Sequence, residues 1–373
     1  MHVVLIMANN SSVPYYNWFA SESRKHPEIK LSFIALHSVR PKMLDEMKAF
    51  DCNCYWIPFD ESRRKRAMLS AIPKLYSLFR KIKPDIVHSS LFDDALPSLV
   101  ASWLARIKCR VVTRPDTGFH WYFAPKAKYF DKINNALASH IVAISEESKR
   151  FLIEKEKADE RKITLIHHGI DIEQLTMQND EAKQRLKKQY GLENKIVVGT
   201  ISRLIEWKGY RFIIEAAPAL VSKYPNMKFL FVGTGGQKEE LEALIKNNGM
   251  QNHIELTGWV DRADIPSLYG VMDIYLHAAF LEPFGFVIPE AMVNAVPIVS
   301  TKTGSAADSI EHLKSGYLID YHSSEQISEG IDFMMTHDKK KIGQAGKLIA
   351  LDLFPFSRMW KNHLSFYKQI LGK

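Results

Sequence analysis

The sequence predicts an α/β fold built from two doubly wound parallel sheets. Short apolar, β-rich runs alternate with longer helical patterns along almost the whole chain, which is typical of repeated βα units. The 373 residues leave room for two domains of roughly 100 to 200 residues each. A polar, charged stretch, residues 171–193, separates two halves that have the same order of elements. We therefore predict two Rossmann-like domains that face each other across a ligand cleft.

Each half is predicted to supply one sheet. The first half has seven β-rich runs, at residues 2–7, 31–36, 55–58, 85–89, 110–113, 140–144 and 164–167. The second half has six, at residues 196–201, 228–232, 254–257, 274–277, 298–300 and 317–319. We place the N-terminal domain at residues 1–172 and the C-terminal domain at residues 190–355, with the polar stretch as a connection and a surface helix.

The composition is that of an ordinary globular protein. It has 46% hydrophobic and 25% charged residues, which excludes a collagen, a coiled coil or a mostly disordered chain. No uninterrupted apolar run reaches the roughly 18 residues of a membrane-spanning helix. The first ten residues lack the basic start and cleavage site of a signal peptide, so we expect a cytoplasmic protein. Cys52, Cys54 and Cys109 suit a reducing compartment and are predicted to be buried thiols.

The net charge of +8 lies entirely in the first half of the chain. Residues 1–171 hold 27 Lys and Arg against 19 Asp and Glu, whereas the remaining residues hold 23 of each. The cations surround an apolar stripe of helical spacing, formed by Leu69, Ile72, Leu75, Leu78 and Phe79. Such a helix either faces the protein's own core or lies on an anionic membrane surface, and both interpretations stay open. Nucleic acid is not an expected partner, because no known nucleic-acid-binding signature accompanies the charge.

Two carboxylates eight residues apart follow one predicted strand of the second half. Strand 274–277 leads into a loop that holds Glu282, and Pro289 suits the first turn of a helix that carries Glu290. Backbone N–H groups at a helix start favour a phosphate, and a carboxylate can accept two hydrogen bonds from a ribose diol. Taken singly, each residue also fits a solvated loop position or a helix-start charge.

Two cations and a glycine cluster follow neighbouring strands of the same predicted sheet. Arg203 and Lys208 lie about one turn apart after strand 196–201. Such a pair neutralises a pyrophosphate and the charge that develops on it as a leaving group. The glycines around Gly235 follow strand 228–232 and allow the backbone to pass close to a ligand. Because the carboxyl ends of parallel strands meet at one edge, these loops together predict a nucleotide-diphosphate site.

The motifs of the second half resemble family 4 of the retaining glycosyltransferases, which have the GT-B fold. The matching elements are the Arg-x4-Lys pair, the Gly-x-Gly loop and the E-x7-E element with its Pro-Phe-Gly core. The resemblance extends over residues 195–319. His168 to Asp171 is similar to the family's Asn-Gly-Val-Asp element. Residues 356–373 are similar to the family's final helix, which crosses back to the first domain.

The resemblance implies a role for each matching residue. Arg203 and Lys208 would hold the donor diphosphate, Glu290 would bind the nucleotide ribose, and Glu282 would lie beside the donor sugar. The amides near Gly285, Phe286 and Val287 would bind the distal phosphate, and the loop around Val260 would contact the base. Gly235 and Phe284 are further donor-binding positions. The implied reaction moves a sugar from a UDP- or GDP-sugar to a hydroxyl of a glycan or lipid-linked glycan, with retention at the anomeric carbon.

The chain departs from the family pattern at three places. The loop after the first strand reads Asn-Asn-Ser-Ser at residues 9–12, where the family often has two glycines. The family's Gly-Gly-x-x-Glu element appears as Gly304 to Asp308. In the first domain, Arg114 takes the place of the family's usual His.

The acceptor side is predicted from this last departure. Arg114, Asp116 and His120 are the candidate residues, with His88 as an alternative histidine. An Arg cannot act as a base, so Arg114 would bind an anionic acceptor or a donor phosphate. His120 would lie near the acceptor hydroxyl as a catalytic residue.

The expected enzyme needs no metal and no other cofactor, and the nucleotide-sugar is its co-substrate. Metal-chelating transferases hold Mg²⁺ or Mn²⁺ with an Asp-x-Asp pair, and no such pair occurs in the chain. The alternatives are a nucleotide-sugar epimerase on the same fold and a binding protein without turnover. The charge of the first half adds the expectation of an anionic partner surface at the inner face of the membrane.

Overall fold

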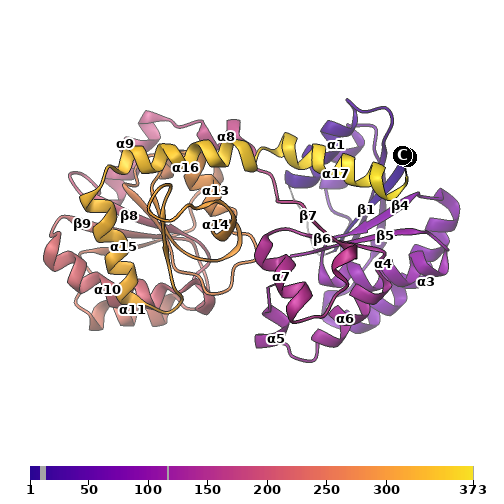
Figure 1. Cartoon of the computed structure of the whole chain (residues 1–373), viewed down its shortest axis with the longest axis horizontal. Coiled ribbons are helices and arrows are strands. Elements are labelled where there is room, and N and C mark those ends of the chain that lie inside the picture. Colours follow the sequence, from indigo (N-terminus) through magenta and orange to yellow (C-terminus); the bar gives the residue numbers. More distant parts are fainter. Residues whose placement is uncertain (9–13, 116, 373) are drawn as a thin grey trace. The chain divides into compact units, whose positions relative to one another are not determined.

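The chain forms two compact α/β units (Figure 1). This computed structural model describes residues 1–8, 14–115 and 117–372. The first unit comprises Met1–His167 and Ser357–Lys373, and the second comprises His168–Phe356. The chain therefore crosses between the units twice, once before His168 and once after Phe356.

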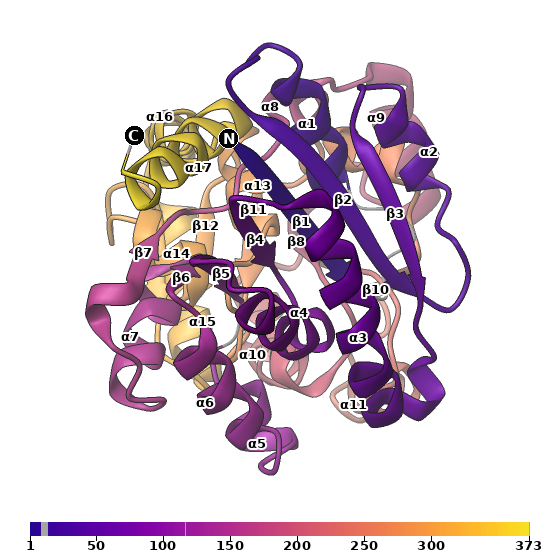
Figure 2. The same cartoon turned by 90° about the vertical axis from the view of Figure 1, so that its right-hand side faces the viewer.

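Each unit is built on one parallel sheet, as the sequence predicts. The order in the first unit is β3-β2-β1-β4-β5-β6-β7, which Figure 2 shows from right to left. Its strands are β1 (His2–Ala8), β2 (Lys30–His37), β3 (Asn53–Pro58), β4 (Ile86–Ser89), β5 (Cys109–Arg114), β6 (His140–Ala143) and β7 (Ile163–Leu165). The order in the second unit is β10-β9-β8-β11-β12-β13. Its strands are β8 (Ile196–Ile201), β9 (Met227–Val232), β10 (Ile254–Gly258), β11 (Ile274–His277), β12 (Ile298–Thr301) and β13 (Tyr317–Ile319).

Helices follow almost every strand. The first unit contains α1 (Pro14–Ser23), α2 (Met43–Lys48), α3 (Arg64–Ile82), α4 (Phe92–Leu104), α5 (Phe119–Phe123), α6 (Lys128–Leu137), α7 (Glu146–Glu154) and most of α17 (Phe356–Ile370). The second contains α8 (Ile172–Thr176), α9 (Asp180–Tyr190), α10 (Tyr210–Lys223), α11 (Lys238–Asn247), α12 (Ile265–Tyr269), α13 (Val287–Val293), α14 (Gly304–Ser309), α15 (Ser324–Thr336) and α16 (Lys339–Leu353). None of these helices, within the residues that the structure describes, has both the length and the apolarity that a bilayer crossing requires.

The polar stretch between the predicted domains belongs to the second unit. It forms α8 and α9, which pack against α13 and α12. Leu186 and Tyr190 of α9 are buried. The stretch is therefore part of the second core rather than a connection between the units.

The apolar stripe of α3 faces the core of the first unit. Leu75 and Phe79 are buried in one cluster with Val4 and Ile6 of β1. Leu69 is the exception, with 66% of its surface exposed. The stripe is thus used for packing, and what α3 offers to solvent is its row of cations.

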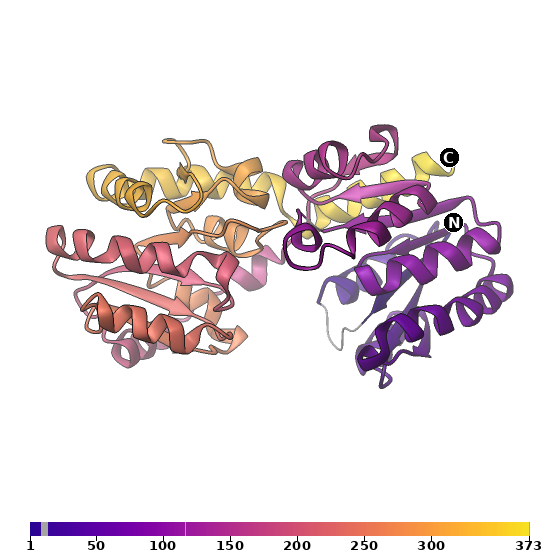
Figure 3. The ribbon, with the colours of Figure 1, turned by 90° about the horizontal axis from the view of Figure 1, so that it is seen from below.

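The last helix, α17, packs on the first unit, and Figure 3 shows it in yellow beside the violet and magenta elements. Trp360 meets the ring of Phe19 with centroids 5.2 Å apart. The hydroxyl of Tyr367 lies 2.6 Å from Nδ1 of His88. These contacts are buried and join residues more than 250 positions apart in the chain, so α17 is an integral part of the first core.

In the second unit, β8 and β11 pair at the centre of the sheet. The chain runs outward from β8 in one direction and from β11 in the other, so the sheet order reverses between them. Ligands of open α/β sheets bind beyond the carboxyl ends of the strands at such a point. The loops after β8 and β11 are therefore the first place to look for a site.

Candidate active site

The loop after β8 is held by the loop after β9. The amide of Ser202 donates to the carbonyl of Val232 at 3.0 Å, and the amide of Leu204 donates to the carbonyl of Thr234 at 2.9 Å. The amide of Gln237 returns a hydrogen bond to the carbonyl of Leu204 at 3.1 Å. These bonds fix the backbone on both sides of Arg203.

The glycines of the β9 loop are required by this contact. A Cβ atom on Gly235 would overlap the carbonyl oxygen of Leu204, and one on Gly233 would overlap that of Ser202. Gly233 also has a φ of +137°, which other residues rarely adopt. The sequence pattern predicts that these glycines give a ligand room to approach the backbone. The structure gives a different reason, the close approach of two backbone segments.

The two predicted cations have different surroundings. Lys208, at the end of the 3-10 turn Glu206–Lys208, forms an ion pair with Glu282 from the loop after β11. Their side chains are only 11% and 12% exposed. Arg203 is exposed, and no ion pair to it is found in the part of the chain that the structure describes. One cation is thus held by a carboxylate and the other faces solvent.

The loop between β11 and α13 is folded tightly around Glu282. Gly285 has a φ of +74°, and a Cβ atom there would lie 2.9 Å from Cγ of Glu282. Gly304 begins α14, and a Cβ atom on it would lie 2.6 Å from the carbonyl oxygens of both Glu282 and Phe284. The amide of Ser305 donates to the carbonyl of Phe284 at 2.7 Å. The single glycine of the Gly304 element therefore has a structural function in this loop.

Glu290 lies in the first turn of α13, as predicted. The hydroxyl of Tyr269 donates to its Oε2 at 3.0 Å. Burial raises the pKa of Glu290 to about 7, while the bond from Tyr269 and the charge of Arg262 act in the opposite direction. Val287 opens the same helix, and the ring of Phe286, just before it, is 43% exposed.

An aromatic cluster connects this loop to the segments at which the chain leaves the second unit. His168 stacks on Phe286 with ring centroids 5.2 Å apart and planes 22° apart. Phe354 meets Phe284 edge-on at 5.7 Å. The amide of Ile170 donates to the carbonyl of Phe354 at 2.9 Å, which ties the two segments together. Sequence reasoning named Phe284 and Phe286 but missed these partners.

The loop after β10, predicted to contact the base, contains Val260 and an exposed tryptophan. Val260 is 9% exposed, whereas its neighbour Trp259 is 77% exposed. Gly258 precedes them with a φ of +72°. Trp259 is not among the residues predicted from the sequence, although a large aromatic side chain in a loop after a strand is a signal for it.

In the first unit, Arg114 lies in a closed ionic network. The residue is 5% exposed at the end of β5. Its guanidinium lies 2.7 Å from Glu156 and 3.1 Å from Asp131, and it donates to Oδ1 of Asn135 at 2.5 Å. Burial raises the pKa of Glu156, and Arg114 acts against that rise. The guanidinium is thus taken up by protein groups, a geometry that does not favour the predicted contact with an anionic ligand.

His120 joins the same network from α5. Its Nδ1 lies 2.7 Å from Oδ2 of Asp131, and its side chain is 16% exposed. The alternative histidine, His88, is 2% exposed and bonded through both ring nitrogens, to Tyr367 and to Thr113 at 2.7 Å. His88 is therefore a core residue. Asp116, and the loop at residues 9–12, lie outside the described residues.

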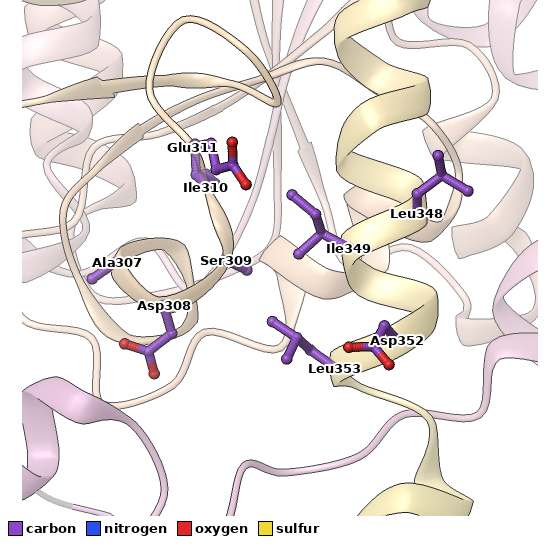
Figure 4. A pocket seen from close by; sticks show the side chains of 9 residues that line it. All are labelled: Ala307, Asp308, Ser309, Ile310, Glu311, Leu348, Ile349, Asp352 and Leu353. Carbon is purple, nitrogen blue, oxygen red and sulfur yellow. The ribbon is translucent and has the colours of Figure 1, made fainter.

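A pocket of about 650 Å³ opens elsewhere in the second unit, between α14 and α16 (Figure 4). It is lined by Ala307, Asp308, Ser309, Ile310, Glu311, Leu348, Ile349, Asp352 and Leu353. None of the predicted donor residues lines it. The candidate site is instead the edge formed by the loops after β8, β9, β10 and β11. Across residues 1–8, 14–115 and 117–372, no three His, Cys, Asp or Glu side chains are grouped as a metal site requires.

The fold places the protein in the GT-B class. A crystal structure of Anabaena Alr3699/HepE in complex with UDP matches 99% of this chain and 99% of its own, with a TM-score of 0.81 and 22% identity. A glycosyltransferase from Rickettsia africae ESF-5 matches 99% of this chain and 98% of its own, with a TM-score of 0.80 and 22% identity. The predicted fold class is confirmed.

Sequence comparisons then identify the family. The model described as Glycosyltransferase Family 4 matches residues 42–174, and that described as Glycosyl transferases group 1 matches residues 182–348. The capsular polysaccharide biosynthesis glycosyltransferase CapM of Staphylococcus aureus is 26% identical over 339 residues, 87% of this chain and 88% of CapM. Spore coat protein SA of Bacillus subtilis strain 168 is 23% identical over 357 residues, 90% of each chain. The chain belongs to the family 4 glycosyltransferases, and the predicted enzyme class is confirmed.

The network around Arg114 predicts a large loss of stability on its removal. Arg114→Met leaves Asp131 and Glu156 as buried carboxylates without their cation, so we expect the free energy of unfolding to fall by about 3 to 5 kcal/mol. Urea denaturation measures it, with the exposed Lys108→Met as a control that changes stability by less than about 0.5 kcal/mol. If the Arg114→Met variant is instead as stable as the wild type but no longer binds the acceptor, Arg114 is an acceptor-binding residue after all.

Proposed function

We propose that this glycosyltransferase is a retaining, metal-independent enzyme that moves a sugar from a UDP- or GDP-sugar to a hydroxyl of a glycan or lipid-linked glycan. The observation that carries the proposal is the meeting of the loops after β8 and β11. The first supplies Arg203 and Lys208, the second supplies Glu282, and α13, which follows the second loop, supplies Glu290. Two cations and two carboxylates at one sheet edge suit a ligand with a diphosphate and several hydroxyl groups.

The donor would bind along this edge. The diphosphate would lie on Arg203 and Lys208, with the distal phosphate at the amides of Gly285, Phe286 and Val287. The ribose would donate to Glu290, and the base would lie at Val260 and Gly235. Structures of HepE hold UDP and UDP-glucose, and a Mycolicibacterium smegmatis relative, 26% identical over 49% of this chain, is named a GDP-mannose-dependent mannosyltransferase. The proposal therefore includes both uridine and guanosine as the donor base.

The chemistry breaks the bond between the anomeric carbon and the diphosphate. Negative charge builds up on the departing diphosphate, and cations at a partly buried site stabilise that charge. Arg203 and Lys208 would supply this stabilisation in place of a metal ion. The absence of an Asp-x-Asp pair from the sequence supports metal independence. Retention is inferred from the family resemblance.

The acceptor would be met by the first unit. Asp131 orients the ring of His120 through Nδ1, which suits a histidine that contacts a hydroxyl. The similarity to CapM, whose name places it in capsular polysaccharide biosynthesis, supports a glycan or glycan precursor as acceptor. Arg114 would then act on His120 through Asp131 rather than on the acceptor.

The first unit would also meet an anionic surface at the inner face of the membrane. Between Arg63 and Lys83 the chain has eight Lys and Arg and no Asp or Glu. Most of the apolar stripe of α3 faces the core, with Leu69 as the exposed exception, so the cations rather than the stripe would make most of the contact. Each Lys or Arg near an anionic bilayer contributes about 1 kcal/mol.

Nucleotide binding is the first test of the donor site. Thermal-shift assays with UDP, GDP, ADP and their sugar conjugates, in EDTA, should show a selective rise in Tm, because a ligand that binds the folded state stabilises it. Glu290→Ala and Arg203→Ala should abolish the shift, while the exposed Arg211→Ala, in a surface pair with Glu215, should retain it. No shift with any nucleotide would overturn the donor-site assignment, and a shift that requires Mg²⁺ would overturn metal independence.

The raised pKa of Glu290 predicts a pH dependence of donor affinity. The carboxylate that accepts from the ribose forms as pH rises through about 7, so nucleotide-sugar affinity should increase by about tenfold between pH 6 and pH 8. In the ligand-free protein the free energy of unfolding has the opposite pH dependence. The raised pKa of this carboxyl group contributes stability at low pH, and that stability is lost as pH rises. Calorimetry with a nucleotide-sugar measures the affinity, and Glu290→Gln should flatten its profile. An unchanged profile in Glu290→Gln would show that another group titrates.

Membrane contact is tested by sedimentation with vesicles that contain phosphatidylglycerol. At low salt the protein should sediment, and the triple variant Lys65→Gln, Lys74→Gln, Lys81→Gln should bind about tenfold or more weakly. The matched control neutralises three lysines of the second unit, Lys188, Lys246 and Lys340, and should bind as the wild type does. Failure of the wild type to sediment, or an equal loss in the control, would remove this part of the proposal.

A further inference from the structure

His277 is a buried histidine with an unsatisfied ring nitrogen. It is the last residue of β11 and is 1% exposed. Among the residues that the structure describes, its Nε2 has no hydrogen-bond partner. The same atom lies 3.6 Å from Oε2 of Glu282, the oxygen that binds Lys208. The imidazole therefore points at the ion pair of the candidate site but stops short of a hydrogen bond.

Other buried polar groups near His277 do have partners. The hydroxyl of Tyr275 donates to the carbonyl of Ile201 at 3.2 Å, and that of Thr200 donates to the carbonyl of Leu276 at 2.8 Å. Ser300 of β12, which lies opposite His277 in the pairing of β11 with β12, donates to the carbonyl of Thr301 at 2.9 Å. An unpaired buried nitrogen costs stability that an aliphatic side chain would not. We therefore expect another state of the protein in which this nitrogen has a hydrogen-bond partner.

Donor binding creates such a state. In the structure the Lys208 ammonium is bound to Glu282, yet the proposed function requires the same ammonium at the diphosphate. A diphosphate that draws the ammonium toward itself leaves Glu282, only 12% exposed, without its cation. A largely buried carboxylate in that position is strongly destabilised unless another donor replaces the lost one.

We propose that His277 is a positioning residue of the donor site, whose Nε2–H donates a hydrogen bond to Glu282 when the donor diphosphate draws Lys208 away. The inference rests on the proposed function and adds to it a residue outside the E-x7-E and Arg-x4-Lys elements. The shift it requires is small, since the two atoms are already 3.6 Å apart. One oxygen of Glu282 would be held by His277, and the other would remain for a hydroxyl of the donor sugar.

A neutral imidazole suits this role better than a second cation. Burial, and then the charge of Lys208, lower the pKa of His277 to about 3, so the ring stays neutral at ordinary pH. It can therefore donate to Glu282 without opposing the movement of Lys208.

The test compares His277→Leu with His277→Gln. Leu removes the donor, whereas the Gln amide nitrogen occupies nearly the position of Nε2. We expect His277→Leu to keep or raise the Tm of the ligand-free protein, because the unsatisfied nitrogen is gone. Its Kd for UDP or GDP, whichever the wild type binds, should rise about tenfold or more, as expected for a hydrogen bond to a charged group. His277→Gln should return the Kd to within about threefold of wild type.

Two controls make the result specific. Ser300→Ala removes a buried, bonded neighbour, and should lower the Tm without changing the Kd. In a double-mutant cycle, His277→Leu should have no further effect on the Kd in a Glu282→Gln background, because the carboxylate is already absent.

Each contrary outcome has a distinct meaning. A wild type that binds no nucleotide overturns the proposed function and this inference with it. If the wild type binds, an unchanged Kd in His277→Leu, a lowered ligand-free Tm with no change in Kd, or a lack of rescue by Gln overturns the role of His277 alone.

Discussion

The ion pair between Lys208 and Glu282 is the interaction on which the site depends. It joins the loops that follow β8 and β11, the two strands at which the order of the second sheet reverses. Those strands are paired at the centre of the sheet, but the chain leaves them in opposite directions. The loops also share a backbone hydrogen bond, from the amide of Phe280 to the carbonyl of Trp207 at 3.0 Å, and the ion pair adds a side-chain contact between a cation and a carboxylate. The rigid backbone around each partner, fixed by the hydrogen bonds at Leu204 and Phe284, gives that contact a defined position.

Four glycines allow the backbone segments of the site loops to pack closely. Gly233 and Gly235 permit the β8 loop to lie on the β9 loop, and Gly285 and Gly304 permit the β11 loop to fold over Glu282. A side chain on either of the first two would push the β8 loop off the β9 loop, and one on either of the last two would displace the β11 loop around Glu282. These glycines are thus required for loop packing, and they affect ligand binding through that packing.

Most of the fold could be predicted from the sequence, but the partners within the site could not. All thirteen strands lie within two residues of their predicted bounds, because hydrophobic periodicity and parallel βα order are local signals. The same logic placed Arg203, Lys208, Glu282 and Glu290 at one sheet edge. The pairing of Arg114 with Glu156 escaped it, since the two are 42 positions apart and belong to different elements. His277 was read as an ordinary strand residue, because nothing in its local pattern shows that its ring nitrogen faces an ion pair.

Net charge and site charge prove to be separate properties of this molecule. The first half of the chain carries the whole excess of +8, yet the arginine at its sheet edge, Arg114, is neutralised by buried carboxylates. The second half has no net charge, yet it leaves Arg203 exposed and pairs Lys208 with a single carboxylate, that of Glu282. The half of the chain with more cations is therefore not the half that leaves an arginine exposed at the end of a strand in the candidate site. The surplus in the first unit lies instead on the solvent side of α3, where it acts at longer range and is weakened by salt.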